Sequence, residues 1–198
     1  IDGERVAAEK PFTAESAAGE EIMEFTFDAT SVIGTPIVVF EQLYYNDVEI
    51  AVHADIEDEE QTDYIPEIGT TATAQDTEDH VTYATEDVTI IDVVTYTGLK
   101  PETEYEVKGT LMDKETGEPI MVNGKEVTSS VTFVTGAAED GEVSVNGAIE
   151  LTFTFDASAL VGTTTVAYER LYQQGKEVAV HADIEDEEQT VYIPECSQ

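Results

Sequence analysis

Short runs in which apolar and polar residues alternate recur along the chain. In EYEVKGTLM (104–112) and LTFTF (151–155) nearly every second side chain is apolar, which is the period of a strand with one buried face. Turn-forming segments separate such runs, namely DKETGEP (113–119), VNGK (122–125) and QQGK (173–176). No stretch has a convincing helical period. The pattern predicts an all-β fold, an immunoglobulin-like β-sandwich over residues 67–195.

One acidic stretch occurs twice. AVHADIEDEEQT stands at 51–62 and again at 179–190 without a difference, whereas residues 22–50 and 150–178 share only 12 of 29 positions. YIPE follows both copies, at 64–67 and 192–195. The repeat predicts three parts: residues 1–66 as the C-terminal half of a truncated first copy, 67–195 as one complete domain, and 196–198 as a tail. We expect a linker around Tyr64–Gly69.

Acidic residues outnumber basic ones by 44 to 8, and the formal net charge is −36. This charge argues against nucleic acid and anionic membrane surfaces as partners, because both need clusters of Lys and Arg. No apolar run approaches the roughly 20 residues of a membrane helix, so we expect no membrane insertion in this segment. The single cysteine, Cys196, excludes an intrachain disulfide. Without an initial Met or a signal peptide, the chain is expected to be an excerpt of a longer protein.

Calcium is the metal that an acidic segment such as DIEDEE would attract. The D-x-[DN]-x-[DN]-G pattern that organises calcium ligands in a loop is absent, however. We therefore expect a solvated loop, with no metal and no cofactor.

Carboxylates interrupt the apolar faces of two predicted strands. Asp92 shares a face with apolar residues in VTIIDVVTY (88–96), and Glu169 does so in TTTVAYERLY (163–172). Glu41 is the equivalent of Glu169 in the first copy. A lone buried carboxylate is costly, but two that meet can share a proton. The alternative is that either residue faces solvent at a sheet edge.

The repeated segment contributes a histidine and a glutamine. His181 and Gln189 would lie roughly 26 Å apart on a straight strand, so the acidic residues between them must loop back if both serve one site. Histidine can transfer protons near neutral pH. A carboxamide becomes an electrophile only where its carbonyl is polarised and a nucleophile is held against it. A capping Gln and a surface His are the alternative for each residue alone.

Five ordered motifs resemble one known family. They are IGTTAT (68–73), DVVTYTGLKPETEYEVKGTLMDKETGEP (92–119), FTFDASALVG (153–162), VAYE (166–169) and HADIEDEEQT (181–190). Together they resemble the T-Q ester-bond domain, or VaFE-type repeat, of stalks in Gram-positive surface adhesins. VVFE (38–41) in the first copy matches the motif's name more closely still.

The resemblance implies a spontaneous, single-turnover reaction rather than an enzyme. Thr70 and Gln189 would condense into an intramolecular ester with loss of ammonia. His181 would act as the base, and Asp92 and Glu169 would form the acid pair that polarises the carboxamide. Thr71 points to the opposite strand face, and the resemblance selects Thr70. It also implies a crosslinked structural stalk domain, extracellular and anchored to the cell wall, with neighbouring repeats of the same stalk as partners.

The first copy holds only part of such a site. Glu41, His53 and Gln61 are present, but residues 1–66 contain no counterpart of the strands that carry Thr70 and Asp92. We therefore expect Gln61 to remain an amide. An unpaired strand edge would also favour a strand-pairing dimer through residues 1–66.

Other classes of function use some of the same residues. A hydrolase built on Thr70, His181 and Asp92 would need an open pocket. An isopeptide domain needs a lysine on its first strand, and no Lys lies between Glu67 and Leu99. A calcium-binding or ligand-binding immunoglobulin-like adhesive module without a crosslink is the remaining alternative.

Overall fold

The computed structural model describes residue 1 and residues 3–195, and within them the regular structure consists of strands and three short 3-10 turns, with no α-helix. The predicted all-β class is confirmed. The predicted tail, 196–198, which includes Cys196, lies outside the described residues.

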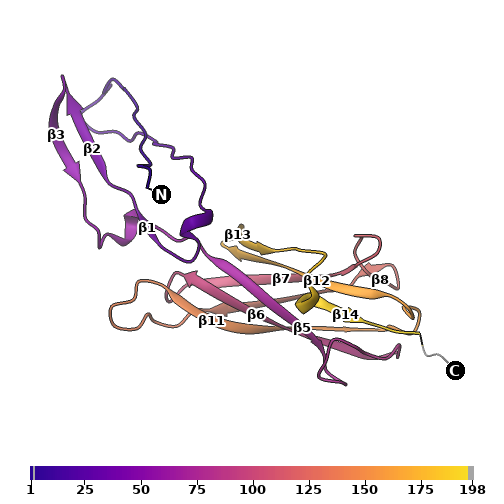
Figure 1. The fold of residues 1–198 in the computed structure, drawn as a ribbon. Helices are drawn as coiled ribbons and strands as arrows, with labels where there is room; N and C mark the ends of the chain where they lie inside the picture. Colours follow the sequence, from indigo (N-terminus) through magenta and orange to yellow (C-terminus); the bar gives the residue numbers. More distant parts are fainter. Residues whose placement is uncertain (2, 196–198) are drawn as a thin grey trace.

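The chain forms two units that follow one another (Figure 1). The first unit contains η1 (Thr30–Val32), β1 (Ile37–Val38), β2 (Glu41–Tyr45), β3 (Val48–His53), η2 (Glu59–Gln61) and β4 (Thr62–Asp63). The second contains β5 (Glu67–Ala74), β6 (Val88–Leu99), β7 (Glu104–Asp113), β8 (Met121–Val122), β9 (Lys125–Glu126), β10 (Thr128–Val134), β11 (Val145–Phe155), β12 (Thr164–Gln173), β13 (Lys176–His181), η3 (Glu187–Gln189) and β14 (Thr190–Tyr192).

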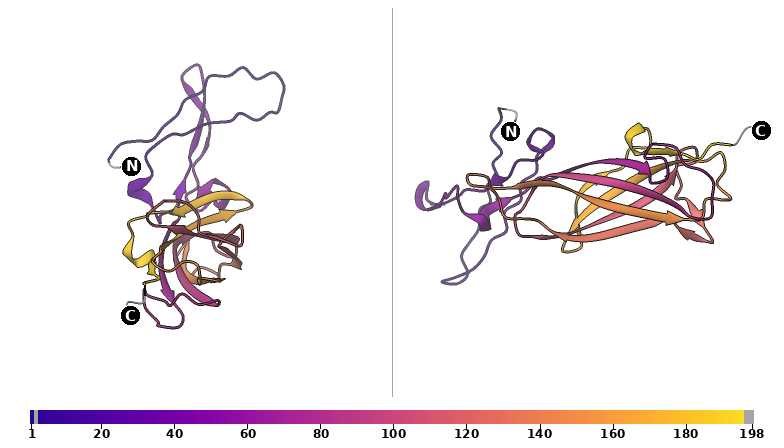
Figure 2. Two further views of the ribbon diagram at one scale, coloured as in Figure 1. Left: turned by 90° about the vertical axis from the view of Figure 1, so that its right-hand side faces the viewer. Right: turned by 90° about the horizontal axis from the view of Figure 1, so that it is seen from below.

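Two antiparallel sheets make up the second unit, and Figure 2 shows them as two layers. One sheet has the order β10-β7-β12-β13, with β14 also paired to β12, and the other has the order β11-β6-β5. Along β7 and β5 the side chains alternate between buried and more exposed, as a sheet with one face in a core requires. The immunoglobulin-like sandwich predicted for this region is therefore confirmed.

The core lies between the two sheets. Its largest fully buried apolar side chains are Ile90, Leu99, Leu111, Leu151, Phe153, Leu171 and Ile193. Gly109 on β7 makes room for this packing, because a Cβ there would lie 2.5 Å from the ring of Phe153. The packing therefore needs glycine at that position.

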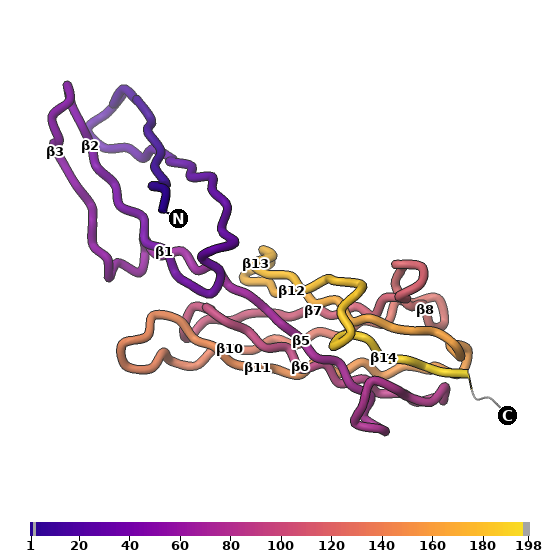
Figure 3. Tube along the Cα trace, in the orientation of Figure 1, coloured from indigo at the N-terminus to yellow at the C-terminus, as the bar shows by residue number. Residues whose placement is uncertain are grey.

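The first and last strands of the second unit lie close together although they belong to different sheets. β5 hydrogen-bonds only to β6 and so forms an edge. It also contacts β13, η3 and β14 across the gap between the sheets, and Figure 3 shows β5 and β14 side by side. This arrangement brings the start of the unit against its end.

The first unit repeats part of the second unit's architecture. Glu41 pairs with His53 and Leu43 with Ala51, followed by a bulge, as Glu169 pairs with His181 and Leu171 with Ala179. The segment equivalent to β11, FTF (25–27), forms no strand. A strand needs a neighbouring strand for its backbone groups, and the described part of the first unit contains no counterpart of β6 beside it.

The connection between the units is shorter than predicted. We expected a linker around Tyr64–Gly69, but β5 begins at Glu67 and only residues 64–66 separate it from β4. Glu67–Gly69 pair with β6 instead, because the alternation of buried and exposed side chains already starts there.

Candidate functional site

The acidic segment loops back between His181 and Gln189. Asp183 Oδ1 accepts a hydrogen bond from the Glu185 N–H at 3.0 Å, and Asp186 Oδ1 accepts one from the Glu188 N–H at 2.9 Å. Such side-chain acceptors favour turns over strand. Asp186 thereby caps η3, and Gln189, the last residue of that turn, is only 1% exposed.

Thr70 lies on the buried face of β5, and its neighbour Thr71 is exposed. The Thr70 Oγ1 hydroxyl donates a hydrogen bond of 3.1 Å to Glu169 Oε2 on β12. This bond joins the two sheets, because β5 and β12 belong to different ones. The only threonine of the pair that faces the interior is therefore the one that contacts a carboxyl group.

Asp92 and Glu169 are both fully buried, with 0% exposure. Asp92 is on the central strand of its sheet, paired with Ala72 on β5 and Leu151 on β11. Burial raises the pKa of Asp92. Burial also raises the pKa of Glu169 to about 10, with a further contribution from the charge of Asp92. At neutral pH the pair therefore retains at least one proton.

His181 lies opposite Glu169 in the β12–β13 ladder. Its Nε2 atom is 2.8 Å from Asp186 Oδ2. Because a carboxylate only accepts, Nε2 carries the proton, and Nδ1 of the neutral ring has the free lone pair. The charge of His181, when protonated, acts to lower the pKa of Asp92.

Asp186 is the site residue that the sequence analysis missed. It orients His181 and caps the turn that ends in Gln189. The signal that could have found it is the repeat, because Asp58 makes the same two contacts in the first unit, to His53 at 2.7 Å and to the Glu60 N–H at 2.8 Å.

Contacts from β14 and from two neighbouring loops hold the same turn. Lys114 Nζ donates to Glu187 Oε1 at 2.8 Å, and the Tyr192 hydroxyl donates to Glu187 Oε2 at 2.6 Å. His80 Nδ1 lies 3.0 Å from the Thr190 carbonyl oxygen. These contacts hold residues on both sides of Gln189, Glu187 through its side chain and Thr190 through its backbone carbonyl.

Several buried polar atoms of the site have no hydrogen-bond partner. Both carboxamide atoms of Gln189, both carboxylate oxygens of Asp92 and Glu169 Oε1 are buried without one, and they are the only such side-chain atoms in the described part of the chain. Each unsatisfied buried group costs about 1–3 kcal/mol. A cluster of unsatisfied groups in a well-packed core marks a place where chemistry rather than packing dictates the residues.

The first unit brings its three predicted residues together as well. With its amide nitrogen turned toward Glu41, Gln61 donates to the two carboxylate oxygens at 2.8 and 3.1 Å. His53 stands opposite Glu41 in the β2–β3 ladder. Within the described residues, no hydroxyl group donates to Glu41 as Thr70 does to Glu169.

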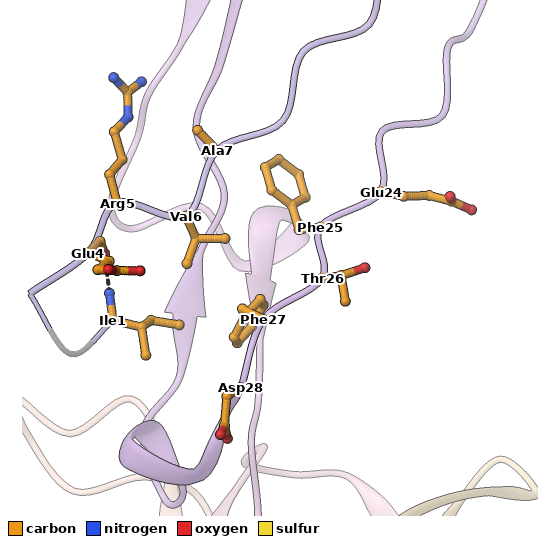
Figure 4. A pocket seen from close by; sticks show the side chains of 10 residues that line it. All are labelled: Ile1, Glu4, Arg5, Val6, Ala7, Glu24, Phe25, Thr26, Phe27 and Asp28. Atoms are coloured by element: carbon orange, nitrogen blue, oxygen red, sulfur yellow. Dashed lines mark hydrogen bonds between the residues drawn. The ribbon is translucent and has the colours of Figure 1, made fainter.

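Open hollows lie away from this site. The one in Figure 4 belongs to the first unit and is lined by Ile1, residues 4–7 and residues 24–28. Among the described residues, no group of three or more acidic, histidine or cysteine side chains is arranged to hold a metal ion. The same part of the chain contains no helix that is both long and apolar enough to cross a membrane.

Comparison with known proteins gives one family. The family model described as T-Q ester bond containing domain matches residues 2–64 and 66–193. Among solved structures, a bacterial adhesin from Mobiluncus mulieris containing intramolecular disulfide, isopeptide and ester bond cross-links is similar in two crystal forms. They have TM-scores of 0.53 and 0.52, at 20% identity over 66% of this chain and 57% of that one.

At this identity the likeness concerns the fold, and the chain spans a little over half the length of the adhesin structure. No curated protein matches the sequence.

Proposed function

Because the chain belongs to the family of T-Q ester bond containing domains, we propose that Thr70 and Gln189 condense into an intramolecular side-chain ester. Thr70 Oγ1 attacks the carboxamide carbon of Gln189, a C–O bond forms, the C–N bond breaks, and one ammonia leaves. His181 receives the hydroxyl proton and passes it to the departing nitrogen. The reaction occurs once per molecule, so the domain is not a turnover enzyme.

The carboxyl pair supplies the electrostatic part of the reaction. A proton kept on Glu169 and shared with Asp92 can be donated toward the carbonyl oxygen of Gln189 as negative charge develops there. Burial makes this interaction stronger than it would be in water. Asp186 keeps the His181 imidazole in the tautomer whose free nitrogen can accept a proton.

The observation that carries the proposal is the carboxamide of Gln189, buried without a hydrogen-bond partner in a turn that contacts β5, the strand of Thr70. Condensation would expel the amide nitrogen and with it two unsatisfied buried N–H groups. Folding would hold the reacting groups in place, which would replace the entropy loss of a bimolecular encounter.

The ester would serve a mechanical purpose. It would close a loop of nearly the whole unit, which stabilises the fold by roughly 4–5 kcal/mol in the loop-closure treatment used for disulfides. A pull on the two ends of the unit would pass from β5 through the ester to β14. The residues between Thr70 and Gln189 would then lie outside the loaded path.

This function fits a stalk domain of an extracellular adhesin anchored to the cell wall. We also propose that residues 1–66 are the C-terminal half of a first copy, whose Gln61 lacks a threonine partner. The exposed apolar side chains along β2 and β3 would support a strand-pairing dimer through this half. These exposed residues are Leu43, Tyr44, Tyr45, Val48, Ile50 and Val52.

Intact-mass measurement tests the crosslink directly. The folded chain should weigh one ammonia less than its sequence predicts, and Thr70→Ala should restore the sequence mass. A domain that acts as a hydrolase or as an uncrosslinked adhesive module would show the full sequence mass in both proteins.

A further inference from the structure

The two units touch through the backbones of two glycines. A Cβ added to Gly98 at the end of β6 would lie 2.7 Å from Cα of Gly34 and 2.8 Å from its carbonyl carbon and oxygen. Both glycines have positive φ angles, 77° at Gly34 and 74° at Gly98. Only glycine combines this conformation with so close an approach.

Each glycine is held by its own unit. The Gly34 N–H donates to the Ile65 carbonyl at 2.6 Å. The Gly98 N–H donates to Asn146 Oδ1 at 2.9 Å, where β11 bulges between Val145 and Gly147. Two preformed turns therefore meet, so the contact needs little ordering when it forms.

The connection beside this contact has little freedom. Only residues 64–66 separate β4 from β5, and Pro66 has a fixed φ angle. Burial raises the pKa of Tyr105 on β7, and the nearby phenol of Tyr64 adds to the shift, so this connection also lies near β7. Figure 1 shows η1 and the start of β5 together at this end of the second unit.

The second unit carries the same surface at its opposite end. Gly162 occupies the repeat position of Gly34, has a φ of 83°, and donates its N–H to the Ile193 carbonyl at 2.7 Å. This duplicates the Gly34–Ile65 bond. Gly162 is exposed, whereas Gly34 is partly covered by the second unit. Figure 2 shows this end of the sandwich, near the C-terminus, far from the first unit.

We propose that the Gly34–Gly98 contact is a rigid joint between successive units, and that the Gly162 surface receives a further unit of the same kind. The occupant would present a turn equivalent to Gly98, with a positive φ and no side chain. This choice of partner follows from the joint already present in the chain. There the turn at Gly34, which has a positive φ and a backbone hydrogen bond like those of Gly162, is covered by the turn at Gly98. Formation of the ester is not required for it.

The first test measures how freely the two units move. Spin labels at Glu49→Cys in the first unit and Glu115→Cys in the second, with Cys196→Ser, should give one narrow distance distribution. Gly98→Ala should broaden it, because the new Cβ overlaps Gly34. Gly117→Ala is the matched control, since Gly117 has a similar φ of 71° but nothing within 4 Å of its added Cβ.

A cooperative unfolding transition of each variant, compared with that of the parent chain, shows whether its second unit still folds. A broad distribution in the parent, or a narrow one in folded Gly98→Ala, would overturn the joint.

The second test extends the chain. Joining a second copy of residues 68–195 directly after Glu195 recreates the YIPE-IGTT junction found at residues 64–71. Labels on the second and third units should then give a narrow distribution that Gly162→Ala broadens and Gly117→Ala leaves unchanged. If the distance distribution between the second and third units is as broad as that of freely jointed domains even without Gly162→Ala, the Gly162 surface is not a docking site.

Discussion

The hydroxyl of Thr70 donates a hydrogen bond of 3.1 Å to Glu169, a residue 99 positions later in the chain. The bond crosses from the edge strand of one sheet to the other sheet. It connects the proposed nucleophile to the carboxyl group whose pKa burial raises to about 10. Folding thus places the alcohol beside an acid that remains protonated at neutral pH, which is unusual for a glutamate.

Replacing Glu169 should remove most of the reactivity. Glu169→Gln retains the size of the side chain but cannot share an acidic proton with Asp92. We expect ester formation to slow by about 100-fold or more, in line with the loss of one oxyanion-stabilising donor. The measurement is the time course of ammonia loss by intact mass after refolding. Glu41→Gln, the same change in the first unit, should leave the time course unaltered, and an unchanged rate in Glu169→Gln would contradict the assigned role.

Asp186 should act through His181. Asp186→Asn can still accept the capping hydrogen bond from Glu188 but has lost the negative charge beside the imidazole. We expect the condensation to slow by about 10–100-fold, as for other residues that orient a functional histidine, and the pH dependence of its rate to shift. Asp58→Asn is the control, because it makes the same change beside His53. A slower rate with an unshifted pH profile would indicate a structural role only.

The sequence predicted the fold well because the alternation of apolar residues is strong in the second unit. β5, β7 and β11 all contain the expected buried faces. It did not predict that FTF (25–27) forms no strand, since a strand depends on neighbours that a local pattern cannot supply. It also assigned Glu67–Gly69 to a linker, although these residues pair with β6.

In the candidate site, the sequence indicated Asp92 and Glu169, because each is a charged residue on the apolar face of a predicted strand. The choice of Thr70 for the reaction came from resemblance, although the structure now shows that Thr71 is the exposed neighbour. Asp186 was one of five acidic residues in a solvated loop. Asp186 can be distinguished from the other acidic residues only in the folded structure, where the loop turns back and Asp186 contacts His181.

Stability without the ester should fall as pH rises. In the unfolded chain Glu169 ionises near its ordinary value of 4.5, whereas the folded domain keeps its proton up to about 10. Between these values the unfolded state binds fewer protons, so the free energy of unfolding decreases by up to about 1.4 kcal/mol per pH unit for this group.

Denaturant unfolding of Thr70→Ala at about pH 5 and about pH 9 measures this decrease. The double variant Thr70→Ala, Glu169→Gln should have a shallower dependence. Equal stabilities of Thr70→Ala at the two pH values would mean that Glu169 is not held protonated by the fold.

The crosslink should raise the stability of the second unit. Thr70→Ala prevents the ester and should lower the free energy of unfolding by roughly 4–5 kcal/mol, because the unfolded chain regains the freedom of a long loop. Thr71→Ala is the matched control on the exposed face of the same strand and should retain both the ester and the stability. Proteolysis should follow the same order, with Thr70→Ala cleaved fastest.

The two parts of the chain that match the family should differ in chemistry. Gln61 lies with Glu41, His53 and Asp58, the repeat equivalents of Glu169, His181 and Asp186. No threonine hydroxyl in the described residues reaches Glu41, so an acyl donor is present without a nucleophile. The full chain should therefore lose one ammonia and not two.

Peptide mapping should find Gln61 as a free amide and Gln189 linked to Thr70. Gln189→Ala should abolish the mass loss, and Gln61→Ala should leave it unchanged. The contrary result would be loss of a second ammonia that the Gln61→Ala variant no longer shows. Gln61 would then have reacted without a threonine placed as Thr70 is. The nucleophile's position on β5 could then no longer explain why the second unit reacts.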